Sequence, residues 1–461
     1  MSVQLAAIVP HPPIILPQIG QGQEREIRAS ISAYREIARR VRALSPDTLV
    51  IISSHATSYM DYFHISPGKK ARGDFRRFGA EQVQVNAVYD EAFSLALEKN
   101  AKRAGVAAGT KGEREKALDH GTMIPLSFLA ERELPCEIVR IGLSGMGAVE
   151  HYRLGKCIKK TAEELDRTIV VVASGDLSHK LLESGPYGFH ESGPEFDRKA
   201  TEAIAKGDFF SLMTLDPVLC EEAAECGLGT FWVLAGTLDR TSIKSELLSY
   251  EGPFGVGYAV AAFTPEGADE SRAFDVLYQR AERERLGGIR AGEDAFVRLA
   301  RETAEAFVRT GEVPALPQGL PEEMRNTRAG VFVSLKIAGK LRGCIGTISA
   351  VTESISQEIV KNAVAAASED PRFDPVRPDE LERITYSVDV LGPVERIDSI
   401  EQLDAKRYGV IVISGYRKGL LLPNLEGVDT VEEQVKIAKR KAGIPESERC
   451  RMERFEVVRH T

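Results

Sequence analysis

Continuous apolar runs alternate with helical patterns in the first half of the chain, and this alternation constrains the fold more than any other feature. Such runs are typical of strands covered on both faces of a sheet. The four runs are Val3–Val9, Thr48–Ser53, Cys136–Leu143 and Thr168–Ala173. Helical patterns lie between them, around residues 27–44, 89–104, 122–132 and 149–165. The pattern predicts an α/β sandwich around a central, largely parallel or mixed sheet.

The C-terminal end of this first domain is marked by two β-rich runs, Ile243–Tyr250 and Gly255–Phe263. We therefore place the boundary near Pro265 and assign residues 1–265 to the first domain. Residues 266–290 are polar and charged, which suits a linker or a solvated helix.

A smaller α+β domain is expected over residues 291–461. Apolar residues at helical spacing run from Phe296 to Phe307, and a second helical pattern begins at Ile355. Between them, residues 331–347 have the pattern of a hairpin, and residues 384–391 and 409–413 are expected to be strands.

Composition and charge exclude several classes of protein. The chain has 461 residues, six cysteines and a formal charge of −8. No apolar run approaches the roughly 20 residues of a membrane span, and the first residues lack a signal-peptide pattern. A mildly acidic chain is also a poor generic binder of nucleic acids. Scattered cysteines without pairing motifs fit reduced thiols, so we expect a cytoplasmic protein without a membrane or nucleic-acid partner.

The histidines are concentrated in the first domain, where seven of the eight lie between residues 11 and 190. Three of them, His11, His55 and His179, follow predicted strands directly, and His120 lies in a loop that opens a helix. Ligands of open α/β sheets bind at the carboxyl ends of the strands. Each histidine alone would suit an ordinary surface or core position, but together they predict one shared site.

Two neutral imidazoles and one carboxylate are the facial ligand set of non-haem iron(II), and they leave coordination positions open. A further histidine that titrates near neutrality suits proton transfer to or from a substrate. The pattern therefore predicts a metal site with acid–base residues beside it.

Four short motifs of the first domain resemble those of LigB-type class III extradiol dioxygenases and the related Memo proteins. They are Pro10-His11-Pro12, Ser54-His55-Ala56, Asp119-His120-Gly121 and Ser174-Gly-Asp-Leu-Ser-His179. The resemblance implies that His11 and His55 bind iron(II), or another divalent metal, and that His120 and His179 move substrate protons. It also implies an oxidoreductase that uses O₂ to open the ring of a small, catechol-like aromatic.

The third metal ligand has two candidates one residue apart. The dioxygenases supply a glutamate from this region and Memo-type proteins a cysteine, and this sequence has Glu225 followed by Cys226. A carboxylate suits hard iron(II), whereas a thiolate favours softer metals. We expect Glu225 to be the ligand, with Cys226 as the alternative.

The second domain resembles the AMMECR domain. The resemblance rests on Leu341-Arg-Gly-Cys-Ile-Gly-Thr347, Ala367-Ser-Glu-Asp-Pro-Arg-Phe-Asp374 and the stretch from Leu421 to Pro423. That family has no settled activity. Cys344, with Arg342 near it, is a candidate second site as a thiolate nucleophile or ligand, and the alternative is a buried structural cysteine.

The combination of both domains resembles the AmmeMemoRadiSam arrangement, in which Memo-like and AMMECR proteins accompany a radical-SAM enzyme. This implies a second function class, a metal-binding accessory protein that works with a radical-SAM partner and cleaves no ring itself. Relatives of this kind also form homo-oligomers, so self-association is a further expectation.

Overall fold

The computed structural model describes residues 2–130, 136–425 and 427–461, which divide into two compact units at Arg280 and Ala281. The first unit is built around a six-stranded mixed sheet with the order β7-β2-β8-β1-β10-β9. Its strands are β1 (Val3–Val9), β2 (Thr48–Ser53), β7 (Glu137–Gly142), β8 (Ile169–Ser174), β9 (Thr241–Glu251) and β10 (Tyr258–Ala268). The first four of these strands are parallel, and the β9–β10 hairpin joins them antiparallel through β1.

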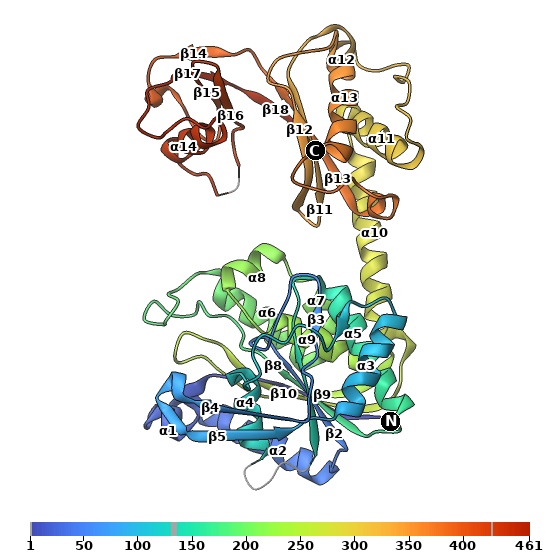
Figure 1. Ribbon diagram of the computed structural model, residues 1–461, viewed down its shortest axis with the longest axis vertical. Helices are drawn as coiled ribbons and strands as arrows, with labels where there is room; N and C mark the ends of the chain where they lie inside the picture. The colour runs from blue at the N-terminus through green and yellow to red at the C-terminus, as the bar shows by residue number, and fades with distance from the viewer. Residues whose placement is uncertain (1, 131–135, 426) are drawn as a thin grey trace. The chain divides into compact units, whose positions relative to one another are not determined.

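Helices cover both faces of this sheet (Figure 1). One buried apolar cluster packs α3, α5, α6, α7 and α9 against one face, and a second packs α2 and α4 against the other. The helices are α1 (Pro17–Gly20), α2 (Arg28–Leu44), α3 (Glu91–Arg103), α4 (His120–Leu129), α5 (Ala148–Glu164), α6 (Ser192–Lys206), α7 (Phe209–Met213), α8 (Pro217–Ala223) and α9 (Leu228–Thr237). The expected α/β sandwich with a mixed central sheet is confirmed.

Two small sheets supplement the central one. They are the hairpin of β4 (Lys70–Phe75) with β5 (Ala80–Val88), and the pair of β3 (Phe63–His64) with β6 (Ala108–Gly109). The helix expected over residues 122–132 begins earlier, at His120, and its last two residues lie outside the described residues.

The boundary expected near residue 265 falls inside β10, because the ladder continues past Pro265. A register shift follows the proline, which has no N–H to donate, and pairing then resumes between Gly267 and Ser242. Most of the segment expected as a linker or solvated helix is helical, since α10 spans Phe274–Gly292.

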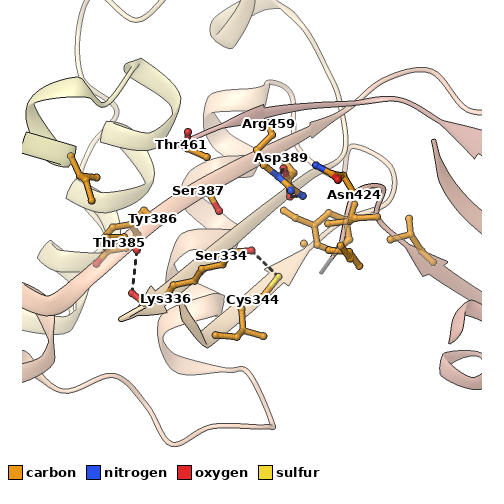
Figure 2. Close-up of a pocket in the computed structure, with 18 of the residues that line it drawn as sticks. Ser334, Lys336, Cys344, Thr385, Tyr386, Ser387, Asp389, Asn424, Arg459 and Thr461 are labelled. Atoms are coloured by element: carbon orange, nitrogen blue, oxygen red, sulfur yellow. Dashed lines mark hydrogen bonds and ion pairs between the residues drawn. The ribbon is translucent and has the colours of Figure 1, made fainter. Parts of the chain in front are cut away.

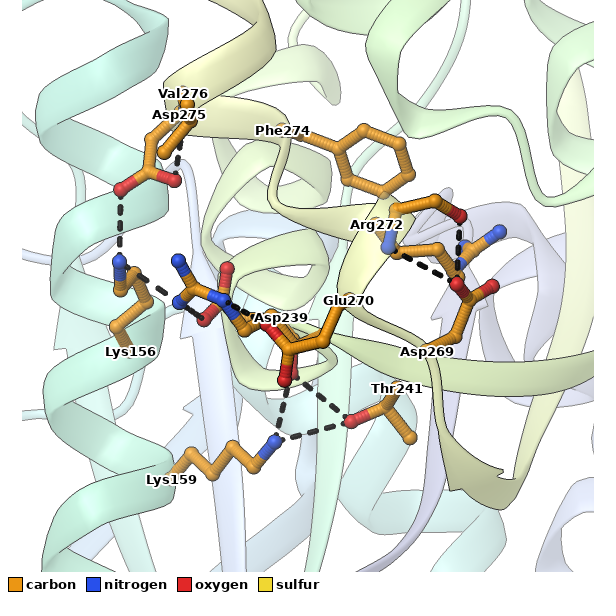
Figure 3. A network of polar contacts seen from close by, with 12 residues as sticks. Lys156, Lys159, Asp239, Thr241, Asp269, Glu270, Arg272, Phe274, Asp275 and Val276 are labelled. Atoms are coloured by element: carbon orange, nitrogen blue, oxygen red, sulfur yellow. Dashed lines mark hydrogen bonds and ion pairs between the residues drawn. The ribbon is translucent and has the colours of Figure 1, made fainter.

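A polar network holds the beginning of α10 against the first unit. Lys156 on α5 lies 2.8 Å from the carboxylate of Asp275 and 3.8 Å from that of Asp239. Lys159, one turn further along, donates to the carbonyl of Asp239 and to the hydroxyl of Thr241 (Figure 3). All residues of this network precede Ala281, so the network lies within the first unit.

The second unit contains two four-stranded sheets. Their orders are β12-β11-β13-β18 and β14-β17-β15-β16. The strands are β11 (Val331–Ile337), β12 (Lys340–Gly346), β13 (Ile384–Leu391), β14 (Glu395–Ile397), β15 (Gly409–Ser414), β16 (Arg417–Leu421), β17 (Arg451–Phe455) and β18 (Val457–His460). The helices are α11 (Ala295–Thr310), α12 (Glu322–Asn326), α13 (Ile355–Ser368) and α14 (Val431–Lys441). This unit is the smaller α+β part expected from the sequence. Among the described residues of both units, no helix is long and apolar enough to cross a membrane.

Helices α5 and α9 approach so closely that their contact requires glycine. A Cβ atom added at Gly155 would lie 2.1 Å from the carbonyl oxygen of Val233 and 2.7 Å from the Cα of Gly236. Both distances are shorter than any van der Waals contact, so a side chain would force the two helices apart.

We expect Gly155→Ala to lower the free energy of unfolding of the first unit by about 1–3 kcal/mol through overpacking. Gly288→Ala on α10 is the matched control, because no atom lies within 4 Å of its added Cβ. Calorimetric unfolding of the full chain measures both changes. Equal unfolding temperatures for the two variants would contradict the proposed packing constraint.

Candidate metal centre

The loops that follow three central strands meet at one edge of the sheet. Strand β8 lies between β2 and β1 and is parallel to both, so their carboxyl ends point the same way. His11 follows β1, His55 follows β2 and His179 follows β8, while His120 begins α4. The ring centroids of His55 and His120 are 4.0 Å apart, and that of His11 lies 4.7 Å from His55.

Three side chains place donor atoms close enough to share one ion. The Nε2 atoms of His11 and His55 are 3.0 Å apart, and the Sγ of Cys226 lies 3.6 Å from Nε2 of His11. All three donors lie within 4.8 Å of one another. Imidazole nitrogens bind transition metals at about 2.0–2.1 Å, so two ligands of one ion stand about 3 Å apart at a right angle. Two imidazoles and one sulfur therefore fit a transition metal ion.

Hydrogen bonds orient the ring of His11. Its Nδ1 lies 3.0 Å from the hydroxyl oxygen of Ser174, and that hydroxyl donates its own hydrogen to the carbonyl of Gly121. The Ser174 oxygen therefore accepts from Nδ1–H, which leaves the lone pair of Nε2 directed toward His55 and Cys226. Such a partner on the second ring nitrogen is common for metal-binding histidines.

Burial keeps the clustered imidazoles neutral. Desolvation, followed by repulsion from His55, lowers the pKa of His11 to about 3. The same two causes lower the pKa of His120 to about 3. Desolvation also lowers the pKa of His55 and of His179. A neutral imidazole can act as a metal ligand or accept a proton, so the rings are ready for either role.

Of the two candidates for the third ligand, the geometry favours Cys226 over the expected Glu225. The carboxylate of Glu225 accepts the backbone N–H of Leu228, 2.7 Å away at the beginning of α9, and it is absent from the described donor group. The sulfur of Cys226 accepts the backbone N–H of Asp176 at 3.3 Å. The two side chains diverge because Ala224, the residue after α8, has a left-handed conformation with a φ of 53°, and the chain then turns sharply.

Glycines bring the turn that carries Cys226 to the strand ends. A Cβ at Gly175 would lie 2.3 Å from the Cα of Gly227, so the loop after β8 and the turn before α9 pack backbone against backbone. This close approach also places Asp176 and His179 beside Cys226, and these three residues form a second group of candidate donors within 4.8 Å.

Both carboxylate oxygens of Asp176 lie close to His11. Its Oδ1 accepts the backbone N–H of His11 at 2.8 Å, and its Oδ2 lies 3.8 Å from Nε2 of the same residue. Desolvation raises the pKa of Asp176 to about 6. His179 itself stacks on Tyr187, with the ring centroids 5.0 Å apart.

Sequence reasoning missed Arg140, a 1% exposed side chain in the middle of β7. Its guanidinium donates to the carbonyls of Ala117 and Glu115 and to the hydroxyl of Ser66, and it lies 3.7 Å from the carboxylate of Asp119. These bonds hold the loop that leads into His120. The sequence could have indicated Arg140, because it is a charged residue inside an otherwise apolar strand. A buried charge needs polar partners, so such a residue indicates a polar network.

A cavity of about 740 Å³ opens onto His55 and His120. Its lining includes Arg72, Arg77 and Phe78, and the ring centroid of Phe78 is 5.3 Å from that of His120. A small molecule can therefore reach two of the clustered imidazoles from solvent.

Two further histidines of the first unit are outside the candidate donor groups found among the described residues. His64 is buried on β3, and His190 lies 4.0 Å from the exposed carboxylate of Glu222. In the second unit, the guanidinium of Arg342 binds the carboxylate of Glu380 at 2.8 Å and 2.9 Å. Arg342 is the residue that the register shift between β11 and β12 leaves without a partner on β11.

Comparison with known proteins identifies both units. Residues 5–261 match the family described as the catalytic LigB subunit of aromatic ring-opening dioxygenase, and residues 297–460 match AMMECR1. Protein CA_C1420 of Clostridium acetobutylicum is 39% identical over 468 aligned positions, covering 100% of this chain and 99% of that protein. A Thermotoga maritima protein is 52% identical over 171 residues, 37% of this chain and 98% of its own length.

Among solved structures, the uncharacterized protein PH0010 from Pyrococcus horikoshii is 32% identical to this chain, with a TM-score of 0.34. The match covers 36% of this chain and 88% of the PH0010 chain. The family matches and the full-length relative agree on the same arrangement. The chain belongs to the LigB family of aromatic ring-opening dioxygenase subunits and carries an AMMECR1 domain in the same polypeptide.

Proposed function

We propose that the first unit is a Memo-like metal-binding domain that holds one transition metal ion through His11, His55 and Cys226. The observation that carries the proposal is the sulfur of Cys226 among the donors, 3.6 Å from Nε2 of His11, while the carboxylate of Glu225 caps α9. Iron(II) is the first candidate, and a donor set of two imidazoles and a thiolate also suits copper and zinc.

The ion would supply Lewis acidity and, if it is iron or copper, one-electron chemistry. The side chains of the protein would position the ligands and exchange protons. Ser174 and Asp176 hold His11 in position, and Arg140 holds the loop before His120. His120 lies beside the cavity, where its imidazole can exchange a proton with a bound molecule.

Two roles for such a domain differ in what the histidines do. In a ring-opening dioxygenase acting on a catechol-like substrate with O₂, His179 accepts a phenolic proton and His120 returns one to the product. The neutral imidazole of His179, which can accept a proton, and the cavity open to His120 favour this role. In an accessory protein for a radical-SAM partner, the two histidines need move no proton, and the sulfur in the donor set favours this second role.

The third ligand is tested by metal content. We expect anaerobically purified Cys226→Ser to lose at least about tenfold in metal affinity, because a ligand is removed. Glu225→Gln, one residue away, keeps the metal. Cobalt(II) substitution provides an independent readout, since Cys226→Ser abolishes the thiolate-to-metal absorption and Glu225→Gln retains it. Metal loss in Glu225→Gln alone would overturn the proposed ligand set.

The two roles are separated by oxygen uptake with a panel of catechols after iron(II) loading. If the protein opens rings, His179→Gln and His120→Gln lower kcat by about 10²- to 10⁴-fold, the usual contribution of a general acid or base. Metal content stays unchanged in both variants, and His190→Gln serves as the control. No product from any catechol would exclude the dioxygenase role and leave the metal site standing.

A further inference from the structure

The second unit encloses a cavity of about 940 Å³ that the metal centre does not use. Its floor is one face of the β12-β11-β13-β18 sheet, and this face is unusually polar. Ser334, Cys344 and Ser387 lie directly opposite one another on three neighbouring strands, and all three line the cavity. Figure 2 shows these side chains together, with the hydroxyl of Ser334 donating to the sulfur of Cys344 at 3.2 Å.

The polarity of this face contrasts with the other side of the same strands. Val331, Val333 and Leu335 alternate with the cavity residues along β11 and belong to the buried apolar cluster packed by α11 and α13. The polar face of this sheet lines a cavity, so it is suited to binding a ligand rather than to packing in the core.

The charges around the cavity are predominantly positive. The cationic side chains that line it are Arg285, Lys336, Arg372, Lys441 and Arg459. Asp389 is the one carboxylate side chain in the described lining, and Arg459 binds it at 2.7 Å. Arg372 is engaged by Asp370 at 2.6 Å. Within the described part of the chain, no ion pair or hydrogen bond engages the amino group of Lys336 or Lys441.

Apolar side chains complete the walls. Those lining the cavity include Ile289 on α10, Leu341 on β12, and Leu420, Leu422 and Leu425 from β16 and the loop after it. The cavity therefore combines a polar floor, two lysines whose amino groups have no ion-pair partner among the described residues, and an apolar wall.

Cys344 is not prepared for nucleophilic attack in this cavity. Desolvation raises the pKa of its thiol, so the protonated form predominates near neutral pH. Ser334 and the backbone contacts hold it as part of the floor, since its N–H donates to Asp370 at 2.8 Å.

We propose that this cavity binds a small amphipathic anion, with its carboxylate or phosphate group attracted to Lys336 and Lys441 and its apolar part against the leucines. The site belongs to the second unit alone and does not depend on the metal centre. Its ligand is a free small molecule with one acidic group and a hydrocarbon or aromatic body.

Calorimetric titration of the full chain with 4-phenylbutyrate, phenyl phosphate and the uncharged 4-phenylbutyramide tests the proposal. We expect at least one of the two anions to bind about tenfold more tightly than the amide, because a charged group gains from unpaired cations. The tighter anion identifies the head group as carboxylate or phosphate. Inorganic phosphate alone binds more weakly, since it lacks the apolar part.

Charge-removing variants locate the site. Lys336→Met and Lys441→Met each weaken the anion by about threefold to tenfold, and the double variant loses the preference over the amide. Lys361→Met, an exposed lysine on α13 outside the cavity lining, leaves binding unchanged. Bound anion also slows alkylation of Cys344, measured by peptide mass spectrometry, in Lys361→Met but not in the double variant.

Three outcomes would overturn the proposal. The first is equal binding of the anions and the amide, or no binding of any of them. The second is anion binding that survives in the double variant. The third is inorganic phosphate binding as tightly as the organic anions, which would show that the apolar wall contributes nothing.

Discussion

The parallel pairing of β8 between β2 and β1 is the constraint on which the candidate metal centre depends. Ser174, the last residue of β8, lies opposite both Ser53 of β2 and Val9 of β1, so the three strands end level. The loops after them consequently begin at the same height on the sheet edge. His11, His55 and His179 need only a few residues of loop each to meet, and Ser174 itself orients His11.

Burial determines the protonation state of the groups at this edge. Desolvation lowers the pKa of the imidazoles, so they present lone pairs rather than charge. It raises the pKa of the Cys226 thiol as well, with Asp176 adding to the effect. A metal ion that binds sulfur as thiolate must therefore displace a proton, which makes binding in the proposed site weaker at low pH.

The sheets of the two units differ in the polarity of their faces. In the first, both faces of the central sheet are apolar and the chemistry lies at the strand ends. In the second, the sheet containing β11 is apolar on one face, and polar residues of the other face line the cavity. Hairpin and helix patterns were readable in the sequence of the second unit. The polar face was not, because it also needs β13, which follows α13 in the chain and pairs with β11 only in the folded sheet.

Local pattern determined the strands, the helices between them and the positions of the histidines after the strands. The apolar runs at Val3–Val9 and Thr48–Ser53 coincide with β1 and β2, since continuous hydrophobic burial is a property of the segment itself. The choice between Glu225 and Cys226 could not be made that way. Both residues carry suitable ligand atoms, and only the tertiary structure distinguishes their positions, because the left-handed turn at Ala224 and the backbone contact of Gly175 with Gly227 direct the sulfur toward the histidines and the carboxylate toward α9.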